Sequence, residues 1–300
     1  MKTKLYTLIT CAIFLLINTF TAQSKVLLRL NLEKGATYEM TMVMSNKIDQ
    51  EMMGQNVKID QNMEMLLSYL VLEVLPNNNF LVEYSLPKMS MKMKVNGQEM
   101  NFDSEDTAED NPVNQSLKEL NLFKMQFELT PKGTVERISG FDEYAEKISG
   151  NQLLQQSMQM FTNEGNFESF ISQTFNYFPE NEVGPGDKWT ASFHLPAIMN
   201  METIMNFEVV SIENDRINLN VTSDINMDTP IEQGEMKMNM KMSGSQQGNM
   251  VINTGDGWLR DSDLVQKFDM NMKMKNPQSG EDLEIPMQMN SIAKISVIKK

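Results

Sequence analysis

Methionine is the residue type whose number and spacing suggest chemistry in this sequence, which has 29 methionines among 300 residues. In many places methionine recurs at every second position. Because alternate residues of a β-strand point to the same face, such stripes would place rows of thioethers on one side of a sheet. The methionine stripes with the clearest alternation are our candidate ligand-binding residues: Met89, Met91 and Met93; Met236, Met238, Met240 and Met242; and Met270, Met272 and Met274.

Three interpretations of the methionine stripes remain open. They could be ordinary core, although methionine lacks the β-branched shape that favours strands and specifies packing less well than valine or isoleucine. They could line an adaptable concavity for a lipid or another hydrophobic envelope component, since unbranched, polarisable side chains repack around varied partners. They could also bind Cu(I), which favours thioether ligands, although no histidine cluster accompanies them.

Other chemistry has little support in the sequence. His194 is the only histidine and Cys11 the only cysteine, so a zinc site built from several histidines is excluded. The chain contains no Gly-x-Ser-x-Gly nucleophile elbow and no phosphate-binding glycine loop. We therefore expect a protein without enzymatic activity, without a cofactor and without a resident metal site. The net charge of −14 argues against nucleic acid as a partner.

The amino terminus predicts export. Residues 1–22 contain a short basic segment, an apolar core and a small-residue exit, which together are typical of a secretory signal peptide. Cleavage after Ala22 would remove Cys11 and leave no transmembrane segment. A retained membrane anchor and a lipidated Cys11 are the alternatives. We expect a periplasmic, extracellular or outer-membrane-associated protein.

The elements that must position the methionine stripes are mainly strands, because apolar and polar residues alternate along most of the chain. The segment 69–86 predicts a hairpin, and Asn96-Gly97 predicts another. Between about 141 and 178 the apolar period changes to three and four residues, which indicates helices. One helix would contain residues 153–161, and the next would bury Phe167, Phe170, Ile171, Phe175 and Phe178 on one face.

The predicted fold class is mainly β (β-rich α+β), with two curved antiparallel sheets or half-barrels and a central helical insert. Its predicted parts are a signal peptide (1–22), an N-terminal β half (23–140), a helical insert and linker (141–180) and a C-terminal β half (181–300). The two halves look alike at a glycine turn that leads to an aromatic residue, Gly35 to Tyr38 in one and Gly186 to Trp189 in the other.

Four short motifs carry a resemblance to a known family. They are Lys34-Gly35-x-x-Tyr38, Asn101-Phe102-Asp103-Ser104, Pro131-Lys132-Gly133-Thr134-Val135 and Gly184-Pro185-Gly186-Asp187-Lys188-Trp189. In this order they resemble an uncharacterised family of exported proteins from Bacteroidetes-type bacteria, a domain of unknown function. The layout also resembles the half-barrels of lipoprotein carriers, in which a bent sheet and helices enclose an apolar cavity. This resemblance implies a location and a broad shape, and it assigns no functional residues.

Overall fold

The computed structural model describes residues 25–52, 54–106, 112–121, 124–149, 164–195, 201–233, 236–275 and 282–300. The predicted signal peptide and the predicted helix over 153–161 lie outside these residues. The described helices and strands are β1 (Thr37–Met52), β2 (Gln55–Val74), β3 (Phe80–Val95), β4 (Gln98–Asp103), α2 (Pro112–Asn121), β5 (Lys124–Leu129), β6 (Val135–Ser139), α3 (Phe141–Ser149), α5 (Glu164–Phe175), β7 (Lys188–Leu195), β8 (Met201–Glu213), β9 (Arg216–Gln233), β10 (Met236–Asn253), β11 (Leu259–Lys275) and β12 (Asp282–Lys299).

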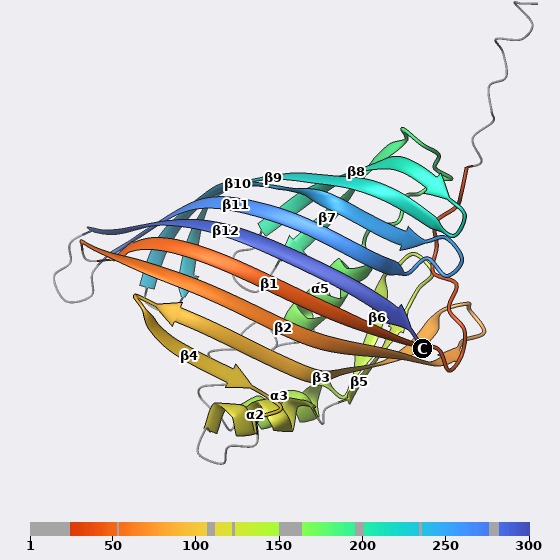
Figure 1. Cartoon of the computed structure of the whole chain (residues 1–300), viewed down its shortest axis with the longest axis horizontal. Coiled ribbons are helices and arrows are strands. Elements are labelled where there is room, and N and C mark those ends of the chain that lie inside the picture. Colours follow the sequence, from red (N-terminus) through yellow and green to blue (C-terminus); the bar gives the residue numbers. More distant parts are fainter. Residues whose placement is uncertain are drawn as a thin grey trace, which may run out of the picture.

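The strands form one curved antiparallel sheet that does not close into a barrel (Figure 1). Its order is β6-β5-β3-β2-β1-β12-β11-β10-β9-β8-β7, and β4 pairs with β3 away from this path. The predicted mainly β class is confirmed. The hairpin over 69–86 and the turn at Asn96-Gly97 are also present, and both turn residues have positive φ angles of 48° and 91°.

The structure differs from the expected pair of sheets because the two β halves share one sheet. Strand β1 pairs with β12 from Tyr38 opposite Lys299 to Gln50 opposite Met287, which joins the halves edge to edge. Local alternation of residues shows where strands occur. It carries no information about pairing between segments at opposite ends of a chain, so the sequence pattern did not reveal this seam.

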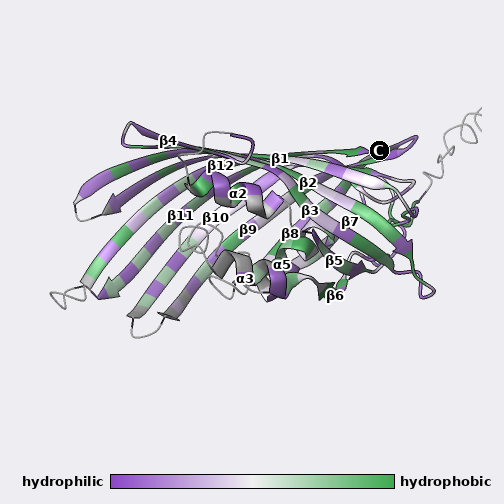
Figure 2. Cartoon of the chain, turned by 90° about the horizontal axis from the view of Figure 1, so that it is seen from below, coloured by the Kyte–Doolittle hydropathy of each residue, from purple (hydrophilic) through white to green (hydrophobic). Residues whose placement is uncertain are grey.

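Burial alternates along the strands as the sequence pattern predicts. In β2 the side chains of Met65, Leu67, Tyr69 and Val71 are buried, and the residues between them are more exposed. Figure 2 shows the same alternation as hydrophobic and hydrophilic bands along β9 to β12. We call the face that carries the buried residues the inner face of the sheet.

Helix α5 is anchored to the inner face by an aromatic cluster drawn from both halves. The ring of Phe175 lies edge-on to Tyr69 and Trp258, with centroids 5.9 Å and 4.9 Å away. Trp258 in turn stacks on Tyr38 at 4.0 Å. These rings are almost fully buried, and aromatic pairs of this kind contribute roughly 0.5–1.5 kcal/mol each beyond area burial. The cluster therefore fixes α5 against the end of the sheet where β1 begins and β2 ends.

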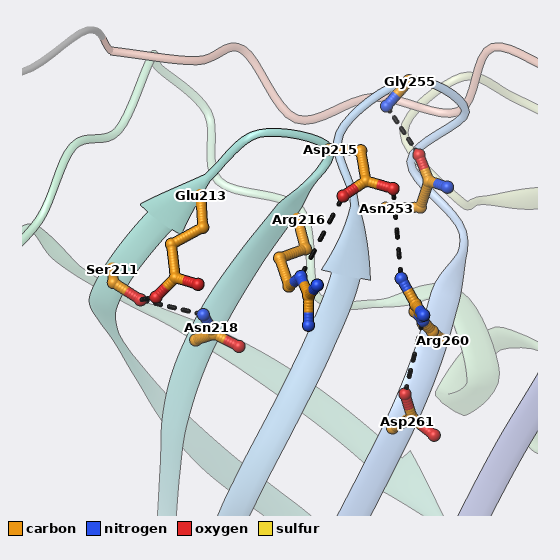
Figure 3. Close-up of polar contacts among 9 residues, drawn as sticks. All are labelled: Ser211, Glu213, Asp215, Arg216, Asn218, Asn253, Gly255, Arg260 and Asp261. Carbon is orange, nitrogen blue, oxygen red and sulfur yellow. Dashed lines mark hydrogen bonds and ion pairs between the residues drawn. The ribbon is translucent and has the colours of Figure 1, made fainter.

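The turns at this end of the sheet are joined by polar contacts (Figure 3). The Asp215 carboxylate, in the β8–β9 turn, lies 4.0 Å from Arg216 and 4.0 Å from Arg260 at the start of β11. The backbone N–H of Thr254 donates to the carbonyl of Asp215 at 2.8 Å. Because these ion pairs are exposed to solvent, we expect them to orient the two hairpins and to add little stability.

The two glycine turns that look alike in sequence also make matching backbone hydrogen bonds. The N–H of Gly35 donates to Val71 and that of Gly186 to Val209, both at 2.8 Å. In return, the N–H of Val71 donates to the carbonyl of Ala36, and the N–H of Val209 donates to the carbonyl of Asp187, the residue after Gly186. Both glycines have positive φ angles, 86° and 85°, a backbone conformation that glycine adopts without a side-chain penalty. The likeness between the halves therefore extends from sequence to hydrogen bonding.

Strands β10 and β11 approach each other closely at two glycines on the inner face. A Cβ atom at Gly248 would lie 1.9 Å from the Asp263 carbonyl oxygen, and one at Gly244 would lie 2.3 Å from that of Lys267. Neither position has room for a side chain. We infer that these glycines permit the local bend that curves the sheet around α5.

Candidate functional site

An apolar cavity of about 430 Å³ lies between α5 and the inner face of the sheet. Strands β1, β8, β9, β10, β11 and β12 contribute its sheet side. Phe170 and Thr174 of α5 and Tyr177 just beyond it contribute the helix side. The volume falls within the range of about 300–1,000 Å³ typical of small-molecule pockets.

The spacing of residues in α5 explains how the helix covers the cavity. Phe167, Ile171 and Phe175 are fully buried and share one face of the helix. Phe170 and Thr174 precede two of these by one position, so they lie on the adjoining face and reach the cavity. The apolar period predicted this helix, although Phe178 lies beyond its end.

Two hydrogen bonds join Tyr177 to the loop before β11 and to β7. Its hydroxyl donates to the carbonyl of Gly257 at 2.9 Å, and its own carbonyl accepts from the Trp189 indole at 3.0 Å. Burial raises the pKa of the Tyr177 hydroxyl. This group therefore stays protonated and serves as a structural donor near physiological pH.

Methionine is the most frequent residue in the cavity lining. Six methionines from five strands contribute to it: Met42, Met205, Met242, Met250, Met270 and Met289. The described residues that line the cavity include no charged side chain. The site therefore offers a deformable apolar surface without an electrostatic anchor.

The structure places nine of the ten predicted methionines in three groups. Met242 and Met270 line the cavity. Another three lie half-buried in β3, outside the lining: Met89, Met91 and Met93. Four more lie farther along β10 and β11, also outside the lining: Met238, Met240, Met272 and Met274. Met236 begins β10, and its side chain lies outside the described part.

The pairing of strands adds a row of methionines that sequence spacing cannot show. Met227, Met242, Met270 and Met287 lie directly opposite one another on the adjacent strands β9, β10, β11 and β12. We call this row the methionine ladder. Directly opposed residues in antiparallel strands have Cβ atoms about 4.5–5.5 Å apart. The methionine stripes along the strands are therefore joined into a continuous thioether surface across them.

A second row on the inner face is polar and uncharged. Its members lie opposite one another on six adjacent strands from β2 to β9. In strand order, this polar row is Gln61, Asn46, Ser291, Gln266, Gln246 and Ser223. Gln246 and Gln266 both line the cavity, and the Nε2 of Gln266 donates to the Oε1 of Gln246 at 2.6 Å. The sequence pattern did not predict this row, although each of these residues interrupts an apolar stripe at an inward-facing position.

Two hydroxyl groups in the cavity lining have no hydrogen-bond partner among the described residues. They are Oγ of Ser262 in β11 and Oγ1 of Thr203 in β8. Only 4% of Ser262 is exposed. A buried hydroxyl without a partner costs roughly 1–3 kcal/mol, so these groups are unusual features of the lining.

A wider hollow of about 880 Å³ extends over β9, β10, β11, β12 and the β1–β2 turn. Its lining is rich in charged and amide side chains, in contrast to the apolar cavity. Lys241 and Asp228 form an ion pair there at 2.8 Å. The hydrogen bond from Lys241 lowers the pKa of the Asp228 carboxyl, and the same bond raises the pKa of Lys241. The hollow therefore keeps both charges near neutral pH.

The described residues do not bring together a cluster of three or more histidine, cysteine or acidic side chains that could hold a metal ion. His194 lies in β7, opposite Glu202 of β8 in the strand register. Within the described part of the chain, none of the helices has the length and apolar character needed to span a bilayer.

Comparison with known proteins identifies a family without an assigned activity. Residues 77–259 match the model of a family described as "Family of unknown function (DUF6263)". This agrees with the resemblance to a domain of unknown function that the sequence motifs indicated. No curated protein matches the chain.

Several solved structures are similar to this chain at low sequence identity. Lipovitellin, described by its lipid-protein interactions, matches with 8% identity and a TM-score of 0.47 over 89% of this chain and 25% of its own. An outer membrane channel from Pseudomonas putida F1 matches with 10% identity and a TM-score of 0.24 over 90% and 97%. OpdQ from Pseudomonas aeruginosa matches with 4% identity and a TM-score of 0.21 over 88% and 99%. The chain thus spans about a quarter of the lipovitellin chain.

Proposed function

The chain belongs to the DUF6263 family of unknown function, and we propose that it is a non-enzymatic protein that binds a lipid or another hydrophobic ligand in the apolar cavity under α5. The observation that carries this proposal is the cavity itself, whose described lining consists mainly of methionine, aliphatic and aromatic side chains and includes no charged one. Met242 and Met270 are the predicted binding residues that we retain at this site.

The apolar lining determines what can fill this cavity. Water gains few hydrogen bonds from an apolar lining, whereas each methylene group transferred from water into such a cavity gains about 0.8 kcal/mol. Methionine side chains have three rotatable bonds, so the lining can adapt to chains of different shape. These properties favour an acyl chain or a similar flexible apolar group as the occupant.

The proposed setting is the cell envelope. It rests on residues 1–22, whose composition is typical of a signal peptide, and it is tested separately by sequencing the amino terminus of the protein recovered from cells. A terminus near Gln23 is expected. Recovery of the intact amino terminus in the cytoplasmic fraction would contradict the proposal.

Native mass spectrometry of the mature protein, purified without detergent or organic solvent, tests ligand binding. We expect discrete extra mass that disappears on denaturation, and extraction should then identify the ligand class. The Ala293→Phe variant should release this mass because Ala293 lines the cavity. Val265→Phe is the matched control, since Val265 is 41% exposed on the opposite face of β11. A bare mass for the unaltered protein, together with no uptake of added lipid, would favour a structural or protein-interaction role with a ligand-free core.

Cu(I) binding is a second candidate, which the methionine ladder favours because it aligns four thioethers on neighbouring strands. Titration with Cu(I) under reducing conditions would give stoichiometric, tight uptake that Met270→Leu weakens. Uptake below one equivalent, or uptake unchanged by Met270→Leu, would exclude the ladder as a copper site.

A further inference from the structure

The polar row gives the cavity a chemical preference, because the rows of residues on either side of it on the inner face are apolar. On one side of it lie Met44 and Leu264, and on the other lie Met289 and Phe268. An apolar core without a ligand would gain nothing from a stripe of amides and hydroxyls at this depth. Polar groups buried among apolar side chains usually need hydrogen-bond partners.

The polar groups that face the cavity are incompletely paired within the protein. Oγ of Ser262 and Oγ1 of Thr203 have no partner among the described residues. The bond from Gln266 to Gln246 uses one donor and one acceptor of the pair. It leaves the Nε2 of Gln246 as a donor and the Oε1 of Gln266 as an acceptor for a ligand.

The absence of charge from the described lining determines which ligand these groups suit. A carboxylate or phosphate buried beside them would lose its hydration without gaining a cation, which is costly in an apolar site. A hydroxyl or amide group can instead accept from Gln246 and donate to Gln266, an ester can accept from Gln246, and a hydroxyl can also pair with Ser262, each at little desolvation cost.

We propose that the cavity selects uncharged amphipathic lipids, placing the apolar chain among the methionines and a hydroxyl, ester or amide group against the Gln246–Gln266 pair or against Ser262, four residues away along β11. This inference rests on the proposed lipid-binding function and specifies its substrate class. The methionines determine which apolar chains can bind, and the polar groups determine which head groups bind more tightly.

The test compares ligands that share one acyl length and differ in the polar group. Dodecanol, monolauroylglycerol and laurate are titrated into the delipidated mature protein by calorimetry at about pH 8, where the carboxyl group of laurate is ionised. We expect both neutral lipids to bind more than about tenfold tighter than laurate. Equal or tighter binding of laurate would overturn the preference while leaving lipid binding intact. Failure of all three to bind would overturn the proposed function as well.

Two variants separate the polar groups from the apolar lining. In the double variant Gln246→Leu, Gln266→Leu, the preference for monolauroylglycerol over dodecane should fall by about fivefold or more, since each lost hydrogen bond is worth roughly 1 kcal/mol. Ser262→Ala removes one hydroxyl with a minimal change of shape and should weaken dodecanol binding by about threefold or more. The matched control is Gln247→Leu, which alters the exposed outer face of β10. Unchanged preference in both variants would refute the assignment of these residues.

Discussion

Replacing Gly248 with alanine tests whether close approach of β10 and β11 shapes the sheet. The new Cβ atom would lie 1.9 Å from the carbonyl oxygen of Asp263 and 2.9 Å from the Cα of Leu264. Both contacts involve backbone, which cannot rotate out of the way as a side chain can. The strands must therefore separate by roughly 1 Å or more to restore ordinary van der Waals contact.

The cost of this separation can be estimated from two effects. Overpacking with a forced backbone shift costs roughly 1–3 kcal/mol, and weakening an interstrand hydrogen bond adds roughly 1 kcal/mol. A total near 2–4 kcal/mol would lower the unfolding midpoint by about 4–16 °C for a domain of this size. Since Leu264 lines the cavity, ligand affinity should fall as well.

Thermal unfolding followed by circular dichroism measures this effect. Gly184→Ala is the matched control, because its Cβ would meet only the Lys25 side chain at 3.4 Å and the Asp187 side chain at 4.0 Å. The control should shift the midpoint by no more than about 2 °C. A midpoint for Gly248→Ala within about 1 °C of the unaltered protein would refute the argument that the strands have no room for a side chain here.

Three further predictions concern the cavity, the aromatic cluster and an exposed ion pair. Ala293→Phe should abolish lipid uptake yet leave the unfolding midpoint unchanged or higher, because the ring fills existing space; uptake equal to that of the unaltered protein would contradict this. Phe175→Ala should lower the free energy of unfolding by about 3–5 kcal/mol in urea titration, and a loss below about 1 kcal/mol would show that the cluster does not hold α5. The hydrogen bond from Lys25, 2.9 Å long, lowers the pKa of Asp187. The stability from this carboxylate is therefore present above the ordinary aspartate pKa of about 3.9 and is lost as pH falls through the lowered pKa. The free energy of unfolding of Asp187→Asn should therefore fall less steeply at acid pH than that of the unaltered protein. Identical profiles of unfolding free energy against pH would contradict the assignment.

The sequence predicted the local structure well because strand and helix periods are local properties. Alternation placed the strands, and the positions of Phe167, Ile171 and Phe175 placed α5. Helix α2 was not predicted. Val113, Leu117 and Leu120 do recur at four- and three-residue intervals in this segment, but ten residues give this period only two repeats, and we did not recognise it.

The site was harder to predict because it depends on register between strands. Alternation identified Met242 and Met270 as inward-facing residues of one strand each. It could not show that they lie opposite one another, or that α5 covers them and leaves Met238 and Met274 outside. The polar row was missed for the same reason. Gln246 and Gln266 are each a single glutamine in the sequence, and they form part of a row only because the strand register places them opposite each other.

The seam between β1 and β12 also imposes an order on folding. Because Tyr38 pairs with Lys299, β1 can complete its pairing only after β12 has been synthesised. Closing the loop between these two residues costs about 5 kcal/mol of chain entropy. Until β12 has emerged, a nascent chain would expose the hydrogen-bonding edges of both β1 and β11 to other chains. Formation of β12 is thus the event that completes the sheet, and a chain without this strand would be left as two halves with open, aggregation-prone edges.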